Sequence, residues 1–252
     1  MMRKPFIAGN WKMNTDSASA VALAASLAEE LKGVDTVDMA VCPPFVYLQS
    51  VAAALSASNI ALGSQNVYFE EKGAFTGETS CGMLKDIGCA YAIMGHSERR
   101  HVMGETDELI NKKVAAAISG GLLPIFCVGE QLQDREGGTT NKVVSGQIKN
   151  GLVGISAEQM QAVTVAYEPV WAIGTGLTAT PQQAQEVHAM IRGLLAELYG
   201  NEIAQSVRIQ YGGSAKPGNT AELMAQPDVD GLLVGGAALK VEDFAAMVKT
   251  IA

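Results

Sequence analysis

The sequence predicts an α/β fold, a (β/α)8 barrel of eight parallel strands with outer helices, from three observations. Short apolar runs alternate with amphipathic helical stretches about eight times within 252 residues. Strands that are joined through helices run parallel, and parallel strands need cover on both faces. No linker rich in Pro, Gly or Ser divides the chain, so we expect one domain over residues 1–252. About eight such units in roughly 250 residues match the size of a closed barrel.

The expected strands are short apolar runs, and each is followed by Gly, Pro or Glu. Such runs, bounded by turn residues, are typical of buried strands. We expect strands over Phe6–Ala8, Met39–Cys42, Ile60–Leu62, Tyr91–Met94, Leu123–Val128, Val163–Tyr167, Val207–Tyr211 and Gly231–Val234. An open, doubly wound sheet is the alternative, but no Gly-x-Gly-x-x-Gly follows the first strand, so the dinucleotide-binding version lacks its fingerprint.

The expected helices follow from apolar residues spaced three and four apart, with capping residues at their ends. Asp16 or Ser17 can cap the first helix, and Gly33 is placed to end it. The capping box Thr180-Pro181-Gln182-Gln183 begins a helix that runs to about Tyr199. We expect further helices over Tyr47–Leu55 and Met83–Ile87, around Ile110–Ile118 and Val143–Ile148, and from about Val241 to Ile251.

Composition excludes several classes of protein. A net charge of −8 argues against nucleic acid as a partner, because its binding needs a basic face. No apolar run reaches membrane-spanning length, and the N-terminal apolar run breaks at Gly9 and Asn10, so we expect no signal peptide and no membrane partner. The four cysteines show no Cys-x-x-Cys spacing, which favours reduced thiols over a metal site. We therefore expect a cytoplasmic protein.

One connection is too long for an ordinary turn. It spans Gln65–Thr79 and carries Ala74-Phe75-Thr76 between Gly73 and Gly77. An aromatic residue at the tip of a protruding loop indicates a partner surface, and a loop packed on itself is the alternative.

Unusual residues stand where the expected strands end. They are Asn10, Lys12, His96, Glu168, Ser214, Gly235 and Gly236. Alone, Lys12 is typical of a solvated charge and His96 of a structural histidine, as we expect for His101 and His188. A Gly-Gly pair alone is typical of a turn. In a barrel, however, the carboxyl ends of all strands meet on one face, so the joint occurrence of these residues indicates a common site.

The stretch Val165–Leu177 combines a strand, a carboxylate and a flap. Glu168 directly follows the strand, and Pro169 ends it because proline cannot donate to the ladder. A flap with an apolar tip and glycines beyond it can close over a ligand and exclude water, although a surface loop is the alternative. The expected lid comprises Pro169, Val170, Trp171, Ala172, Ile173, Gly174, Thr175 and Gly176.

Five segments also carry a resemblance to a known family. They are Gly9–Asn14, Gly95–Arg100, Ala166–Gly176, Tyr211–Ser214 and Asp230–Gly236. Together they resemble the signature segments of the triosephosphate isomerase family, in the right order and over essentially the whole chain. Ala215 and Ala238 stand where the family often has valine and serine, and neither side chain carries the chemistry.

The resemblance implies a TIM barrel that interconverts dihydroxyacetone phosphate and D-glyceraldehyde 3-phosphate through an enediolate, in glycolysis and gluconeogenesis, without cofactor or metal. It implies that Glu168 is the base and that His96, as a neutral imidazole, is the electrophile and proton shuttle. Lys12 would supply positive charge and Asn10 a further donor. These residue types fit the reaction, because moving a proton between adjacent carbons needs a base and an electrophile.

The resemblance also assigns supporting roles. It implies that the phosphate binds the backbone N–H groups of Gly174, Ser214, Gly235 and Gly236, with Asn10 and Lys12 close by. We expect Ser97, Glu98 and Cys127 to support the catalytic groups from behind. The resemblance further implies a homodimer through the Gly73–Glu78 loop, whose Phe75 and Thr76 insert near the neighbour's site.

Two other functions remain open from the residues. The first is a phosphate-sugar aldolase on the same barrel, with Lys12 as the Schiff base. The second is a phosphate-sugar binder without catalysis on the same fold.

Overall fold

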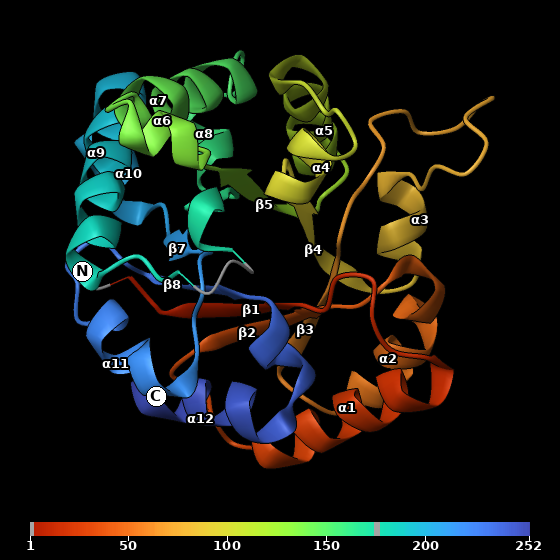
Figure 1. The fold of residues 1–252 in the computed structure, drawn as a ribbon. Helices are drawn as coiled ribbons and strands as arrows, with labels where there is room; N and C mark the ends of the chain where they lie inside the picture. Colours follow the sequence, from red (N-terminus) through yellow and green to blue (C-terminus); the bar gives the residue numbers. More distant parts are fainter. Residues whose placement is uncertain (1–2, 174–176) are drawn as a thin grey trace.

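A computed structural model describes residues 3–173 and 177–252 of the chain. Eight parallel strands close into a barrel in sequence order, with the last strand paired to the first (Figure 1). The strands are β1 (Phe6–Asn10), β2 (Asp38–Cys42), β3 (Ile60–Ser64), β4 (Cys89–Met94), β5 (Leu123–Val128), β6 (Thr164–Tyr167), β7 (Ile209–Tyr211) and β8 (Gly231–Val234). This topology confirms the barrel that the sequence predicts.

Helices form an outer layer around the strands (Figure 1). In the described residues they are α1 (Ser17–Glu30), α2 (Leu48–Leu55), α3 (Cys81–Asp86), α4 (Ser97–His101), α5 (Asp107–Ser119), α6 (Leu132–Glu136), α7 (Thr140–Gly151), α8 (Ala157–Met160), α9 (Pro181–Tyr199), α10 (Asn201–Ser206), α11 (Pro217–Met224) and α12 (Val241–Ile251). Three 3-10 helices accompany them: η1 (Phe45–Tyr47), η2 (Val170–Ala172) and η3 (Gly236–Leu239).

Capping chemistry sets the starts of the long helices. The hydroxyl of Thr180 accepts a hydrogen bond from the backbone N–H of Gln183 at 3.1 Å, and the Gln183 amide oxygen accepts from the Thr180 N–H at 2.9 Å. This reciprocal pair begins α9, which ends at Tyr199 as expected. Asp16, rather than Ser17, caps α1 by accepting from the N–H of Ser19 at 2.8 Å.

The sequence did not predict α6, α8, α10 and α11. They have 5, 4, 6 and 8 residues, and polar residues, Gly and Pro make up most of them. No apolar stripe therefore stands out as it does in α2, which also has 8 residues. The first strand is also longer than expected. Its Asn10 pairs with Cys42 of β2, so ladder hydrogen bonds fix the backbone of a predicted site residue.

Two layers of buried side chains hold the barrel together. One layer lies between the strands and the helices and includes Ile7, Met39 and Val41. The other is a smaller cluster made by the alternate residues of the strands, which therefore fill the inside of the barrel. Its members are Phe6, Ala8, Ala40, Cys42, Tyr91, Ile93, Ile125, Cys127, Ala166 and Leu233.

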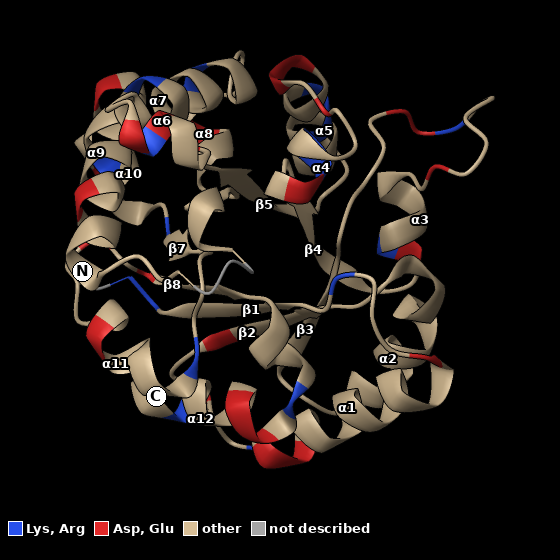
Figure 2. Ribbon diagram, in the orientation of Figure 1, with Lys and Arg blue, Asp and Glu red and all other residues tan. Residues whose placement is uncertain are grey.

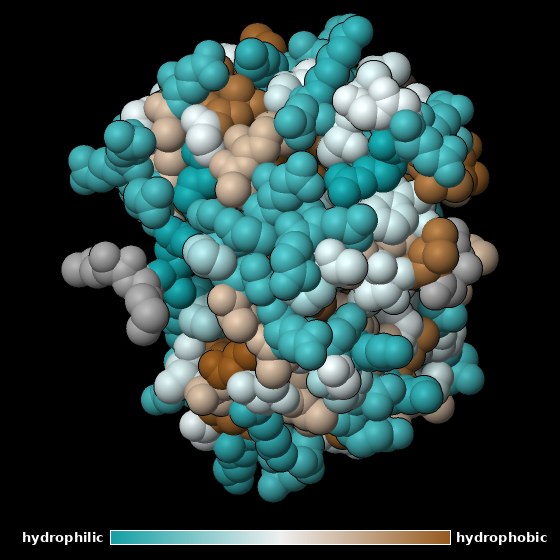
Figure 3. Space-filling view, turned by 60° about the vertical axis from the view of Figure 1, so that its left-hand side comes forward, coloured by the Kyte–Doolittle hydropathy of each residue, from teal (hydrophilic) through white to brown (hydrophobic). Residues whose placement is uncertain are grey.

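Charged residues lie mostly on the helices and loops outside the barrel (Figure 2). The face drawn in Figure 3 is covered mainly by hydrophilic residues, with hydrophobic ones scattered between them. Within residues 3–173 and 177–252, no helix is long and apolar enough to cross a membrane.

His188 is fully buried on α9, where it packs edge-on against Tyr167 at 5.8 Å between ring centroids. Its Nδ1 lies 3.0 Å from the carbonyl oxygen of Asp228, which can only accept, so Nδ1 carries the proton. Burial lowers the pKa of His188 from 6.5 to about 4. The folded protein therefore keeps this imidazole neutral at pH values where the unfolded chain protonates it.

We predict that His188 makes the protein acid-sensitive between pH 6.5 and 4. Below pH 6.5 the unfolded state binds a proton that the folded state refuses, so the free energy of unfolding falls until the pH reaches about 4. This lowering of the pKa corresponds to a loss of roughly 3 kcal/mol. Urea titrations of wild type and His188→Asn at several pH values measure this slope.

The comparison is His101→Asn, at an exposed histidine whose pKa burial also lowers; it should change the slope less than His188→Asn does. Relative to wild type, His188→Asn should lose less stability on acidification, whatever its stability at neutral pH. Parallel curves for wild type and His188→Asn would contradict the prediction.

Candidate active site

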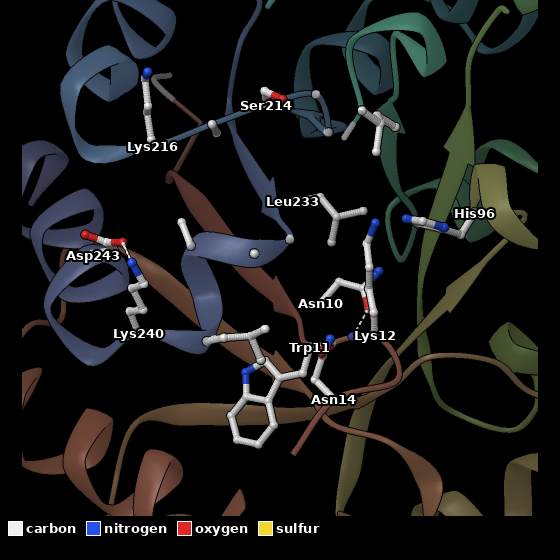
Figure 4. A pocket seen from close by; sticks show the side chains of 18 of the residues that line it. Asn10, Trp11, Lys12, Asn14, His96, Ser214, Lys216, Leu233, Lys240 and Asp243 are labelled. Carbon is white, nitrogen blue, oxygen red and sulfur yellow. Dashed lines mark hydrogen bonds and ion pairs between the residues drawn. The ribbon is translucent and has the colours of Figure 1, made fainter. Parts of the chain in front are cut away.

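A pocket of about 680 Å³ opens at the carboxyl ends of the strands (Figure 4). Six of the residues that the sequence singles out line it: Asn10, Lys12, His96, Ser214, Gly235 and Gly236. They come from β1, the loops after β4 and β7, and the segment after β8. Residues far apart in sequence therefore share one site, although Glu168 is not among the residues that line this pocket.

Neighbouring amides hold Lys12 in an unusual backbone conformation. Its φ is 52°, which side chains other than glycine rarely adopt. The side-chain oxygen of Asn10 accepts from the Lys12 N–H at 3.0 Å. The Gln65 amide donates to the carbonyl oxygens of Lys12 and Cys42, both at 2.8 Å. These bonds aim the Lys12 side chain at Glu98, with Nζ 2.6 Å from Oε1.

Gln65 is a residue that the sequence did not single out. Its only signal was its place directly after Ser64, the last residue of β3. This is the same strand-end position that identifies the other site residues.

His96 caps the first turn of α4. Its Nδ1 accepts from the backbone N–H of Glu98 at 3.3 Å, so the neutral ring carries its proton on Nε2. Glu98 Oε2 also lies 3.5 Å from Nδ1, but Nδ1 has no hydrogen to donate to this oxygen when the proton is on Nε2. The Nε2 atom lies 3.0 Å from Oε1 of Glu168. The N–H of the His96 imidazole therefore faces Glu168, the residue that the sequence predicts to be the base.

Glu168 follows β6 and is buried, with an exposed fraction of 1%. Its carboxylate accepts from the backbone N–H of Ser97 and from the Ser97 hydroxyl, both at 3.0 Å. Gly212 leaves the room for this side chain, because a Cβ there would lie 2.9 Å from Glu168 Cγ. Ser97, which the sequence placed behind the catalytic groups, thus holds the carboxylate away from the pocket.

Cys127 lies in the buried cluster inside the barrel, beside these groups. Burial, and after it the charge of Glu168, raise the pKa of the Cys127 thiol well above its ordinary value. The residue is therefore a neutral thiol that fills space near the carboxylate.

The first part of the expected lid, Pro169–Ile173, folds back onto the rim of the barrel. The indole Nε1 of Trp171 donates to Oε1 of Glu130 at 2.9 Å. The Ser214 hydroxyl donates to the carbonyl oxygen of Ala172 at 2.7 Å. The predicted lid residues Gly174, Thr175 and Gly176, of which Gly174 was also expected to bind the phosphate, lie outside the described residues.

Glu130 is a second residue that the sequence did not single out as functional, although it follows β5 at a strand end. It is fully buried and accepts hydrogen bonds from both Trp171 and the Tyr167 hydroxyl, the latter at 3.0 Å. Burial raises the pKa of Glu130. Glu130 thus joins Val170 and Trp171, which the sequence assigns to the lid, to the barrel.

The segments that follow β7 and β8 line the pocket with glycines and with Ser214. Gly213 has to be a glycine, because a Cβ there would lie 2.3 Å from the Tyr211 hydroxyl oxygen. Gly235 and Gly236 follow β8 directly, and Gly236 begins η3. Free backbone N–H groups at such a turn are suited to a phosphate or another small anion. Within the described part of the chain, no group of three or more His, Cys, Asp or Glu side chains could hold a metal ion.

Comparisons with known proteins agree with this geometry. A sequence model described as triosephosphate isomerase matches residues 5–251. A triosephosphate isomerase of Carboxydothermus hydrogenoformans is 62% identical over 98% of this chain and 99% of its own length. Those of Moorella thermoacetica and Herpetosiphon aurantiacus are 55% and 54% identical, over 98% of this chain and 98% and 99% of their own lengths. The chain belongs to the triosephosphate isomerase family.

Proposed function

We propose that the chain is a triose-phosphate isomerase that interconverts dihydroxyacetone phosphate and D-glyceraldehyde 3-phosphate, a step of glycolysis. The observation that carries this proposal is the pairing of His96 Nε2 with Glu168 at 3.0 Å, beside a pocket that also presents Lys12. An acid–base pair next to an anion site is what a proton transfer within a phosphorylated sugar requires.

The phosphate end of the substrate is assigned to the segment after β8. The backbone N–H groups of Gly235 and Gly236, with that of Ser214, would donate to phosphate oxygens. Glycine permits the close approach, and fixed N–H donors need no reorganisation when the anion arrives. Holding the phosphate in this way would place the carbonyl end of the substrate toward His96.

The carbonyl end would meet His96 and Lys12. A neutral imidazole with its proton on Nε2 can give that proton to the substrate's carbonyl oxygen as negative charge develops there. It can then take the proton of the hydroxyl group on the neighbouring carbon, which restores the neutral ring. The Lys12 ammonium would stabilise the negative charge of the enediolate. Asn10 acts mainly through Lys12, because its side-chain oxygen holds the Lys12 N–H.

Glu168 is assigned as the base that moves the proton between the two carbons. Its carboxylate now bonds to Ser97 and does not line the pocket. Catalysis would therefore require the side chain to leave Ser97 and turn toward the substrate carbon. Every step is a proton transfer, so the reaction needs no cofactor.

The aldolase alternative receives no support from the comparisons, in which the named relatives are triosephosphate isomerases. The geometry is also unfavourable. A Schiff base needs an unprotonated amine, whereas Lys12 is engaged as an ammonium by Glu98 at 2.6 Å.

The proposed function is tested by adding dihydroxyacetone phosphate and coupling the product to glyceraldehyde-phosphate oxidation, with EDTA present. We expect turnover that EDTA does not change. Absence of turnover, or its loss with EDTA, would exclude the proposed reaction. Borohydride in the presence of substrate should leave Lys12 unmodified, whereas trapping of substrate on Lys12 would favour the aldolase.

Changing Glu168→Gln should lower kcat/KM by about 10²-fold to 10⁴-fold, because a base in the transition state contributes about that much. The variant should still bind inorganic phosphate, since the phosphate contacts lie elsewhere. Coupled assays and calorimetry measure the two effects. Glu158→Gln, which changes an exposed glutamate by the same atoms, is the control. Near-normal turnover by Glu168→Gln would remove its assignment as the base.

A homodimer is part of the proposal. The Gly73–Glu78 loop projects from the body of the protein (Figure 1), and its Phe75 remains 38% exposed. Met13, on the loop after β1, and Val46, in η1 after β2, are exposed by 96% and 80% at the same end of the barrel. A second pocket, of about 270 Å³, lies next to the active site between Met13, Phe45 and Met103. An aromatic loop tip from a second copy fits such an apolar recess.

Sedimentation velocity should therefore give a dimer for wild type. Phe75→Asp should weaken association, because it places a charge at an apolar interface. Val153→Asp, at another exposed apolar residue, is the matched control and should leave the dimer intact. A fully active monomeric wild type would contradict the proposal.

We also assign the protein to the cytoplasm, on the basis of its cysteines. All four, Cys42, Cys81, Cys89 and Cys127, are free and buried. Free thiols are typical of a reducing compartment. Fractionation of cells that express the protein tests this assignment, and recovery outside the cytoplasm would contradict it.

A further inference from the structure

The active-site pocket extends outward past η3, beyond the residues that the proposed reaction uses. Two lysines and one aspartate line this outer part: Lys216 after β7, Lys240 after η3, and Asp243 in the first turn of α12 (Figure 4). None of the three has a role in the chemistry described above. Their charges nevertheless stand at the opening through which an anionic substrate has to pass.

The cation inside the pocket is already paired. Lys12 Nζ lies 2.6 Å from Glu98 Oε1, so the two charges largely cancel when seen from a distance. A phosphate dianion that approaches from solvent therefore meets an ion pair at Lys12 and not a free positive charge. Positive charge that attracts the substrate has to come from elsewhere in the pocket.

The outer lysines supply such charge. Lys240 Nζ is 3.9 Å from Asp243 Oδ2, too far for a hydrogen bond, and the Lys240 side chain is 65% exposed. Exposed pairs of this kind are weak, so the ammonium is available to another anion. Lys216 is exposed, and among the described residues it forms no ion pair.

The sign of the charge at the pocket differs from that of the whole chain. The formal net charge is −8, whereas the charged residues of the pocket lining other than the paired Lys12 are two lysines and one aspartate, a sum of +1. Charges more than about 10 Å away are largely screened at physiological salt. An anion at the opening therefore responds to the lysines of the pocket and little to the acidic remainder of the surface.

We propose that Lys216 and Lys240 form an outer anion-binding edge that captures the phosphate group of the substrate before it reaches the backbone N–H groups of Ser214, Gly235 and Gly236. The substrate identity in this proposal rests on the proposed function. The two lysines act on binding and not on the proton transfers, because they stand apart from His96 at the outer end of the pocket (Figure 4). They set how fast and how tightly a phosphate monoester is taken up.

The test compares wild type with the double variant Lys216→Gln, Lys240→Gln. At low ionic strength kcat/KM should fall about fivefold to tenfold while kcat stays within about twofold, because capture is weakened and the chemistry is not. Added KCl should lower kcat/KM of wild type more steeply than that of the variant. The conservative variant Lys216→Arg, Lys240→Arg keeps both charges and should behave as wild type.

The matched control is Lys142→Gln, Lys149→Gln, which removes two exposed lysines from α7 and changes the net charge by the same amount. It should leave kcat/KM and its salt dependence unchanged. An equal loss in this control would show a general effect of net charge and would overturn the proposal.

A second measurement does not depend on turnover. Calorimetry with inorganic phosphate should give a Kd about fivefold higher for Lys216→Gln, Lys240→Gln than for wild type. If wild type binds phosphate in this lysine-dependent way but does not turn over the triose phosphates, the proposed function fails and the outer edge stands. If wild type and the Lys216→Gln, Lys240→Gln variant bind phosphate equally well, the proposed role of the two lysines is wrong, whatever the turnover.

Discussion

Closure of the parallel barrel is the constraint on which the rest of the structure depends. β8 pairs with β1 in register, Phe6 with Gly231 and Gly9 with Val234, so no strand edge is left open. All strands then point the same way, and their carboxyl ends form one face. The short loops after those ends bring residues more than 200 positions apart, such as Lys12 and Gly236, into one pocket. A break between β1 and β8 would separate the proposed phosphate site from Lys12.

A continuous set of polar contacts then fixes the site. Gln65 and Asn10 hold the backbone of Lys12, Lys12 pairs with Glu98, and the Glu98 N–H sets the tautomer of His96. His96 and Ser97 in turn hold Glu168. Each contact is short and most are buried or partly buried, where hydrogen bonds are strong and an unpaired group is costly. The groups therefore position one another, which is why few of them can change alone.

Most of the fold was readable from local pattern. All eight strands and the long helices α1, α5, α7, α9 and α12 have enough residues for apolar periodicity and capping to identify them. The missed helices, such as α8 with 4 residues, are short and mostly polar, and the capping box between Ser156 and Gln159 is the local feature that marks the start of α8. In the site, Glu168 and His96 stood out at strand ends, whereas Gln65 and Glu130 did not, because their importance lies in contacts with Lys12 and Trp171.

The barrel, its family and the identity of the groups at the strand ends could be inferred from the amino-acid sequence, because they depend on residue type and spacing along the chain. The three-dimensional arrangement was needed to show that the Glu168 carboxylate accepts from Ser97 and does not line the pocket, and that the Lys12 ammonium is paired with Glu98. It also showed that two exposed lysines, Lys216 and Lys240, line the same pocket. Such facts depend on distances between segments that only barrel closure brings together, and no local pattern encodes them.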